Sequence, residues 1–354
     1  MRRGYFQRVQ EQTPTRFWIN NVTRAQADRA IEAGACGCTQ NPAYTWKMLT
    51  SDDAAEQAYV LAQLDAILDS EADDGMALAA LQRTLIGRIA EVFRPMYEQS
   101  HGRCGYVSIQ GDPLHEDAET ILRFARYNRE AGPNIMCKIP VTEEGLKAIE
   151  ELAAQGVPVN ATEVMSVRQA LDVCEVYRRA TRGLAHPAPI YYSHITGIFD
   201  EYLQKQVQRD QIEIDSDILW QAGIAAAKKT YRMTKARYPE VGFIGGGARG
   251  LQHFTEMVGA DAVVTINWTG TADRLIEKDF PVIEAFQRPT PDYVLDALLE
   301  KVSDFARGYE VHGLVPAEYE DFGPVVLFRS SFESAWENAL AFIRERRKAG
   351  GDRR

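Results

Sequence analysis

Cysteine is scarce in this sequence, and the few cysteines follow no regular spacing. The chain of 354 residues contains five: Cys36, Cys38, Cys104, Cys137 and Cys174. An odd number of widely scattered cysteines does not predict the disulfide framework of a small secreted protein. The Cys36-Gly37-Cys38 triplet is a weak metal-binding signal, and because free cysteine is commonly buried we interpret both thiols as buried or half-buried.

Long apolar runs and metal-ligand clusters are also missing. No apolar run reaches the roughly 18 residues that a membrane-spanning helix needs. Residues 1–20 lack the apolar stretch of a secretion signal, so we expect a cytoplasmic protein. No group of histidine, aspartate and glutamate has the spacing of metal ligands, so we expect neither a metal nor another cofactor.

Positive charge is in deficit, with 40 Lys and Arg against 50 Asp and Glu and a net charge of -10. This balance argues against nucleic acid or an anionic membrane as a general partner. It leaves open a small anionic substrate, which responds to local charge. With 45% hydrophobic and 25% charged residues, the composition is that of an ordinary globular protein with a large core.

Short apolar segments alternate with helical patterns along the first 280 residues. The predicted strands are residues 16–20, 35–39, 106–110, 135–140, 158–164, 189–195, 241–247 and 261–267. The longest predicted helical stretch between them runs from about residue 52 to residue 99. Eightfold alternation predicts an α/β protein with a single (β/α)8 TIM barrel, and a doubly wound open sheet is the alternative.

The stretch after Pro281 is less regular. It contains predicted helices near residues 293–306 and 331–348, separated by a polar loop. We therefore divide the chain into a barrel, residues 1–280, and a C-terminal helical extension packed on it, residues 281–354. No low-complexity linker and no internal repeat interrupts this organisation.

One lysine, Lys138, lies inside an apolar predicted strand, IMCKIP. Burying an ammonium group is unfavourable unless the group is paired or has lost its proton. Alternate residues of a barrel strand face the axis, and barrel active sites lie at the carboxyl ends of the strands. An inward Lys138 would reach that mouth, where a lowered pKa makes its amine a nucleophile toward a carbonyl. The alternative is a lysine whose head meets a carboxylate at the barrel wall.

Polar residues occupy the inward positions or the ends of most neighbouring predicted strands. They are Asn20, Asn41, Ser108, Gln110, Asn160, Thr162 and Ser193. Asparagine and serine are common in loops and caps, so each residue alone carries little information. Together they indicate the rim of a small-molecule site.

A glycine-rich stretch, GFIGGGARG at residues 242–250, follows the seventh predicted strand. Glycines there let backbone N–H groups approach an anion at a helix N-terminus, a place where barrels often bind phosphate. Arg249 would add a forked, charged donor. The alternative is a tight turn with a solvated arginine.

Four stretches of the sequence resemble the transaldolase family of Schiff-base barrel enzymes. CTQNPAYT (38–45) resembles the family's Thr-Thr-Asn-Pro motif, and residues 138–170 resemble its lysine motif with the Asn-x-Thr strand that follows. YYSHITGIFDEY (191–202) resembles its Ser-Pro-Phe segment, and GGGARG (245–250) the segment that ends in a phosphate-binding arginine. The resemblance covers about residues 16–275, and the lysine falls on the fourth strand, as it does in that family.

The resemblance implies a role for each matching position. Lys138 would form an imine with a ketose or ketone donor, and Thr162 would hold the water that shuttles protons during imine formation. Gln110 would lie beside that water. The implied substrate-binding residues are Asn20, Asn41, Asn160, Ser193 and Arg249.

The sequence departs from the family at several positions. The first strand of the family carries an aspartate that acts as general acid/base where the carbon–carbon bond breaks, and this sequence has Asn20 there. The third strand of typical transaldolases ends in a glutamate, and this sequence has Gln110, as in the aldolase branch. A second phosphate-binding arginine is matched by Ile198, which favours a modified or unphosphorylated sugar.

Another group must then move the proton, and the candidates are Asp112, Glu163 and His194. Strand parity points Glu163 and His194 away from the barrel axis, so we favour Asp112, which follows the third strand on the inward parity. For Asp112 the alternative is a turn residue before Pro113. For His194 the alternative is a structural histidine.

We therefore expect an enzyme of carbohydrate metabolism, either a transaldolase-type transferase or an aldolase, acting on a sugar or sugar phosphate through Lys138. After the carbon–carbon bond breaks, a three-carbon unit would stay bound to Lys138. It would then add to an aldehyde acceptor, as in a transaldolase, or take a proton, as in an aldolase. Two alternatives stay open: a phosphate-binding isomerase or synthase, and a non-catalytic sugar-binding relative, which the amides of Asn20 and Gln110 favour. We expect no nucleic-acid or membrane partner, and a homo-oligomer is compatible with the sequence.

Overall fold

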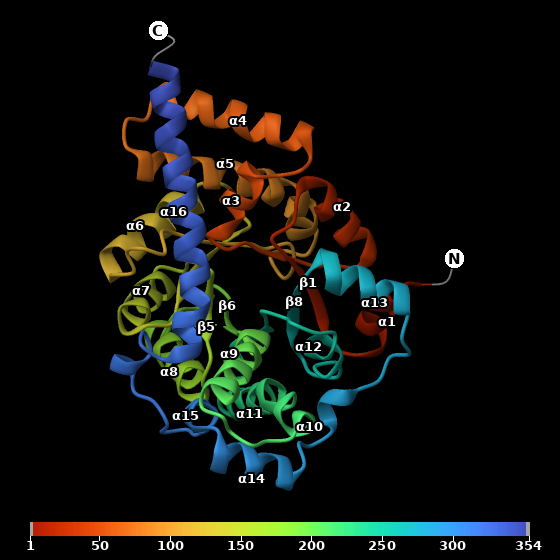
Figure 1. The fold of residues 1–354 in the computed structure, drawn as a ribbon. Helices are drawn as coiled ribbons and strands as arrows, with labels where there is room; N and C mark the ends of the chain where they lie inside the picture. The colour runs from red at the N-terminus through yellow and green to blue at the C-terminus, as the bar shows by residue number, and fades with distance from the viewer. Residues whose placement is uncertain (1–2, 352–354) are drawn as a thin grey trace.

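The computed structural model describes residues 3–351 and contains eight parallel strands that close into a barrel in chain order (Figure 1). The strands are β1 (Arg16–Asn20), β2 (Cys38–Thr39), β3 (Val107–Gln110), β4 (Ile135–Pro140), β5 (Val159–Val164), β6 (Ile190–His194), β7 (Gly242–Gly245) and β8 (Val263–Asn267). Strand β8 pairs with β1 along its whole length, so the sheet has no free edge. The predicted (β/α)8 barrel is confirmed, and the open-sheet alternative is wrong.

Helices surround the barrel, and further helices precede its first strand and follow its last strand (Figure 1). Those of the first half are α1 (Tyr5–Gln12), α2 (Arg24–Ala33), α3 (Ala43–Leu49), α4 (Ala54–Leu68), α5 (Asp74–Gln99), α6 (Ala118–Arg129), α7 (Glu143–Ala154) and α8 (Val167–Ala180). Those of the second half are α9 (Thr196–Arg209), α10 (Ser216–Leu219), α11 (Ala222–Arg237), α12 (Gln252–Thr255), α13 (Asp273–Lys278), α14 (Asp292–Lys301), α15 (Ser303–Tyr309) and α16 (Gly323–Gly351).

Two features of the predicted element order are wrong. The single helical stretch at residues 52–99 is two helices, because Asp53 and Asp73 each accept backbone N–H groups as the N-caps of α4 and α5. Helix α9, which begins at Thr196 directly after β6, was also not predicted. Because it follows the strand without a loop, its first turn lies at the carboxyl end of the barrel.

The turn from β4 into α7 holds the end of the lysine strand in place. The Thr142 hydroxyl accepts a hydrogen bond from the Gly145 N–H group at 3.0 Å and so caps α7. A side chain at Gly145 would collide with the carbonyl oxygen of Pro140, the last residue of β4. This close approach explains why a glycine stands in the first turn of the helix.

The last helix, α16, crosses the barrel face instead of lying in the outer ring (Figure 1). It contacts α3, α5, α9 and β5. Trp336 and Ile343 of this helix, and Phe322 just before it, belong to the same hydrophobic cluster as the barrel strands. The extension therefore covers the carboxyl ends of the strands, while its boundary at residue 280 stays a prediction. None of the described helices is sufficiently long and apolar to cross a membrane.

Candidate active site

A cavity of about 210 Å³ lies at the carboxyl ends of the strands, under α16. Nine of its lining residues are polar and uncharged: Asn20, Asn21, Thr39, Asn41, Thr162, Ser193, Thr265, Asn267 and Ser331. Among the described residues, its charged lining side chains are Lys138 and Arg249, and Phe328, Ser331 and Phe332 cover it from α16. A small polar molecule fits such a lining, because hydroxyl and amide groups can replace its hydration.

Lys138 points into this cavity from β4 and is 6% exposed. Burial, opposed by the nearby charges of Glu163 and Glu116, lowers the pKa of Lys138 to about 8. Its amine lies 5.4 Å from the centroid of the Phe332 ring. Within residues 3–351 no carboxylate makes an ion pair with this amine. Glu163 and Glu116 therefore act on Lys138 through their charge and not through a close ion pair.

Asn20 is part of an uncharged hydrogen-bond chain along the cavity wall. Its Oδ1 accepts the Thr39 hydroxyl at 2.8 Å, and its Nδ2 donates to Asn267 Oδ1 at 2.9 Å. Thr39 is also 2.8 Å from the Thr265 hydroxyl. Asn20 both donates and accepts in this chain, so both ends of its amide group have partners. It has no carboxylate to exchange a proton.

Asn160 and Ser193 lie deeper, beside Ser108. The Ser193 hydroxyl donates to Asn160 Oδ1 at 2.7 Å, and Asn160 Nδ2 donates to the Ser108 hydroxyl at 3.1 Å. Ser193 reaches the cavity lining, whereas Asn160 is fully buried and forms the layer beneath it. Thr162 lines the cavity, and its buried hydroxyl has no hydrogen-bond partner among the described residues.

Asn41 follows β2 and lines the cavity. Its N–H donates to Asn21 Oδ1 at 3.0 Å, and its own Oδ1 accepts the Ala43 N–H at 3.1 Å. The loop after β2 is therefore tied to the loop after β1, which fixes the Asn41 side chain at the rim.

Glu163 overturns the strand-parity prediction. The register between β5 and β6 shifts between Ala161 and Val164, and Glu163 has a left-handed φ of 65°. Its carboxylate is fully buried and accepts a hydrogen bond from Gln110 Nε2 at 2.9 Å. The prediction that Glu163 points away from the axis is wrong, because the bulge turns it toward the inward Gln110.

Asp112 and His194 have partners away from the main cavity. The Asp112 carboxylate accepts the Leu114 N–H at 2.8 Å and contacts His115 Nδ1 at 2.9 Å, as a turn residue does. It lines a second cavity of only about 10 Å³, together with Gln110, Glu116 and Lys138. His194 is fully buried with its Nδ1 at 3.1 Å from the Thr196 hydroxyl, and burial lowers its pKa to about 3.

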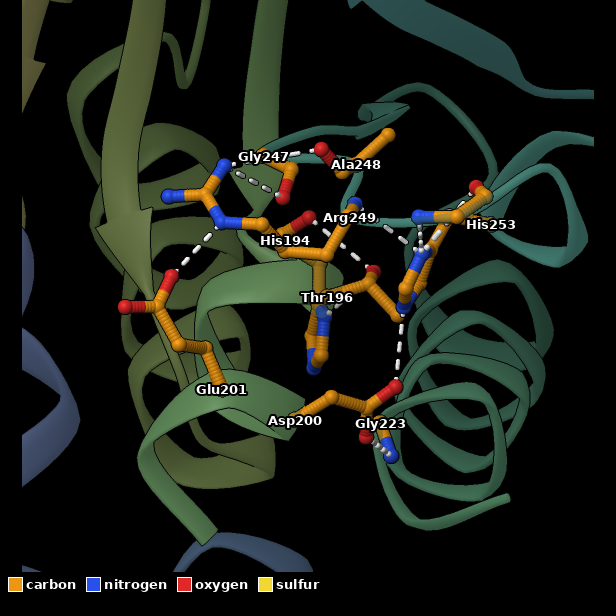
Figure 2. A network of polar contacts seen from close by, with 10 residues as sticks. His194, Thr196, Asp200, Glu201, Gly223, Gly247, Ala248, Arg249 and His253 are labelled. Atoms are coloured by element: carbon orange, nitrogen blue, oxygen red, sulfur yellow. Dashed lines mark hydrogen bonds and ion pairs between the residues drawn. The ribbon is translucent and has the colours of Figure 1, made fainter. Parts of the chain in front are cut away.

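A buried network fixes the glycine-rich loop after β7 (Figure 2). The N–H groups of Arg249 and Gly250 donate to His253 Nδ1 at 3.2 and 3.1 Å. The opposite ring nitrogen, Nε2, lies 2.8 Å from Asp200 Oδ2. Asp200 in turn accepts the Gly223 N–H. The network connects α9, α11 and the loop, and it was not predicted because Asp200 and His253 lie far apart in the sequence.

Arg249 itself is half-exposed at the cavity rim, and its Nε donates to Glu201 Oε2 at 2.6 Å (Figure 2). Ile198, at the position expected for a second arginine, is 3% exposed. A side chain at Gly247 would meet Ile195 and Ile198, and Gly247 has a φ of +66°. An apolar Ile198 therefore supports the loop where the family resemblance implies a charged residue.

Several residues around Lys138 could not be identified from the sequence. Glu116 precedes α6, and both its oxygens are buried without a hydrogen-bond partner in the described part of the chain. Burial raises the pKa of Glu116 and that of Glu163, and the charge of Arg329 on α16 opposes this rise in each. Within residues 3–351 no three His, Cys, Asp or Glu side chains are grouped so that they could hold a metal ion.

Fold and site together define a (β/α)8 barrel whose small-molecule cavity is centred on a fourth-strand lysine. The chain belongs to the transaldolase/fructose-6-phosphate aldolase family, whose model matches residues 17–281.

Curated relatives agree with this assignment. Transaldolase 2 of Nostoc sp. is 29% identical over 247 residues, which cover 62% of this chain and 62% of that protein. The transaldolase of Saccharopolyspora erythraea is 30% identical over 245 residues, covering 64% of this chain and 62% of that protein. The transaldolase of Neisseria meningitidis (serogroup C) is 29% identical over 193 residues, covering 52% and 53%. The chain therefore spans less than two thirds of the length of these relatives.

Proposed function

We propose that the protein is a transaldolase-type enzyme in which Lys138 forms a Schiff base with a sugar or sugar-phosphate carbonyl. The observation that carries the proposal is a buried amine with a pKa of about 8, open to a polar cavity. A neutral amine attacks a carbonyl, and an enclosed mouth protects the resulting imine from bulk water. The protonated imine then withdraws electrons from the neighbouring carbon–carbon bond, which breaks or forms.

The polar residues of the cavity support this chemistry by their positions. Thr162 offers an unpaired hydroxyl to a water molecule beside the imine. Asn41 and Ser193 face the space where donor hydroxyls would lie, and Asn160 orients Ser193 by accepting its hydrogen bond. Gln110 reaches Glu163 and so affects the protonation of Lys138 indirectly.

The charge at the rim favours a substrate with at most one weakly held anionic group. The guanidinium of Arg249 is already paired with Glu201, and Ile198 adds no charge. A phosphate would have to compete with the Glu201 carboxylate for the same donor. We infer a modified or unphosphorylated sugar, with a sugar phosphate as the weaker substrate.

A lyase is the second candidate, because β3 ends in Gln110, the residue type that the resemblance implies for the aldolase branch. In either reaction, Asn20 cannot take the proton of the hydroxyl whose carbon–carbon bond breaks. Asp112 does not offer an obvious replacement, since both its carboxylate oxygens have partners. Release of dihydroxyacetone from a ketose without an aldehyde acceptor identifies a lyase, whereas transfer that needs an acceptor identifies a transaldolase.

The test of the Schiff base is trapping by borohydride. Wild-type protein is incubated with dihydroxyacetone or a panel of ketoses, reduced, and analysed by intact mass spectrometry. We expect a covalent mass increase in the wild type and none in Lys138→Met, which keeps the length of the side chain. A panel that leaves the wild-type mass unchanged would defeat the proposal.

A further inference from the structure

The hydrogen bond between Glu163 and Gln110 spans β4, the strand that carries Lys138. Glu163 belongs to β5 and Gln110 belongs to β3, and β4 runs between these two strands in the barrel. The left-handed backbone at Glu163 and the register shift at this point are costly features for a non-glycine residue. Their structural consequence is to turn a buried carboxyl group toward Gln110, close enough to Lys138 for its charge to act on the amine.

One oxygen of Glu163 is available for proton transfer. Oε1 accepts the Gln110 amide at 2.9 Å. Oε2 is buried and has no hydrogen-bond partner among the described residues. A buried carboxyl oxygen without a partner is unfavourable unless the group holds a proton or meets a ligand or water. Thr162, the preceding residue, lines the cavity, and its buried hydroxyl also has no hydrogen-bond partner among the described residues.

Charged groups reach Glu163 from three sides. Burial is the largest influence: it raises the pKa of Glu163 and lowers that of Lys138. The Gln110 hydrogen bond and the charges of Lys138 and Arg329 oppose the rise at Glu163, whereas the charge of Glu333 adds to it. Glu116 is a second buried carboxyl group, and the charge of Glu163 helps to raise its pKa. The two burial shifts move the pair toward its uncharged form, a carboxylic acid and a free amine.

We propose that Glu163 donates the proton that completes imine formation at Lys138 and takes it back when the imine is hydrolysed. This role rests on the Schiff-base function proposed above. The Lys138 amine attacks the carbonyl carbon, a carbon–nitrogen bond forms, and one amine proton moves to the oxygen. The carbon–oxygen bond of this carbinolamine then breaks, and its hydroxyl leaves as water with the Glu163 proton. The products are a protonated imine and the Glu163 carboxylate, so the charges balance and the two ions stabilise each other.

The experiment compares the rate of imine trapping in two carboxamide variants. Dihydroxyacetone is the probe, and cyanoborohydride-reduced protein is quantified by mass spectrometry over time from pH 6 to pH 9. Glu163→Gln keeps the size of the side chain and an oxygen for the Gln110 hydrogen bond. Glu116→Gln is the matched control, because it removes the other carboxyl group that acts on Lys138.

We expect Glu163→Gln to slow trapping at pH 7 by about 100-fold, the usual loss when a general acid is removed. Where Glu163 is ionised, the variant also removes a negative charge that raises the pKa of Lys138, which alone would increase the fraction of free amine and speed trapping. Glu116→Gln is expected to trap within about threefold of the wild type. A Glu163→Gln protein that traps as fast as the wild type, or faster in parallel with Glu116→Gln, would show that Glu163 acts only through its charge and would overturn the proposal.

A second measurement follows the Glu163 carboxyl group directly. The infrared band of a protonated carboxyl group that the wild type shows and Glu163→Gln lacks belongs to Glu163, and it should disappear from the wild type when dihydroxyacetone binds. Persistence of this particular band after imine formation also contradicts the proposal. If the wild type forms no adduct at all, the Schiff-base function fails; if it forms one while Glu163→Gln is unimpaired, this inference alone fails.

Discussion

At Lys138, burial and nearby negative charge act in opposite directions on one amine. Burial has the larger effect, so the pKa of Lys138 is about 8 instead of 10.5. At pH 7 this leaves about one amine in ten uncharged, against about one in three thousand for an ordinary lysine. A difference of this size separates a usable nucleophile from a solvated cation.

The same reasoning, applied to thiols, predicts which cysteine reacts first. Burial raises the pKa of Cys38, Cys137 and Cys174, whereas the thiol of Cys104, stabilised as a thiolate by its contact with Cys36, has a pKa lowered to about 6. Cys104 is also partly exposed. Peptide mapping after brief iodoacetamide treatment at pH 7 should find the label on Cys104, and Cys104→Ser should remove this fast reaction. Prior labelling of Cys38 would contradict the burial argument.

At the scale of residues, the alternation of side chains along a strand made several residues of the site predictable from the sequence. Lys138, Thr162 and Ser193 reach the cavity because strands alternate their side chains. The same rule failed at Glu163, since a bulge with a left-handed residue breaks the alternation and leaves no mark in the amino-acid pattern. Asp112, chosen in its place, has the contacts of a turn residue.

At the scale of elements, α16 determines how dry the cavity is. Phe332 is 2% exposed and its ring lies over the Lys138 amine. Phe332→Ala should lower the free energy of unfolding by about 3 kcal/mol. It should also admit water, so that the pKa of Lys138 rises and the midpoint of the trapping rate against pH moves above 8.

Phe305 of α15 provides the matched control for this prediction, because it is fully buried in the core and does not line the cavity. Phe305→Ala should cost a similar free energy of unfolding and leave the midpoint unchanged. Equal shifts in both variants would mean that general loosening, not the covering ring, controls the amine.

The network behind the glycine-rich loop makes a second prediction at this scale. Asp200 and His253 are both nearly fully buried and lie 2.8 Å apart. Removing one partner leaves the other buried without its contact, so Asp200→Ala and His253→Ala should each lower the free energy of unfolding by about 3 kcal/mol. In urea titrations the double variant should cost clearly less than the sum. Additive losses would show that the two side chains do not act as a unit.

Element positions were harder to predict than element types. The periodicity of residues 331–348 predicted a helix, and the structure has one, from Gly323 to Gly351. Nothing local specified that it would cross the barrel mouth. That placement depends on packing with α3, α5 and α9, which are helices distant from α16 in the sequence.

At the scale of the whole molecule, the barrel and its extension share one hydrophobic core. Phe305, Phe322 and Trp336 lie in the same cluster as the barrel strands. We therefore expect a single unfolding transition in differential scanning calorimetry, with the calorimetric and van't Hoff enthalpies equal. Two separate transitions would make residues 281–354 an independent unit. The barrel itself was predictable because eight strand–helix alternations leave few other architectures.

The measurement that tests the Schiff-base function most directly is the site and pH dependence of the reduced adduct. Wild-type protein is reduced in the presence of dihydroxyacetone at a series of pH values, digested, and the modified peptide is sequenced by mass spectrometry. We predict a single modified residue, Lys138, with a trapping rate that rises with pH to a midpoint near its pKa of about 8. Modification of surface lysines instead, with a midpoint near that of an ordinary lysine, would contradict the function proposed for this site.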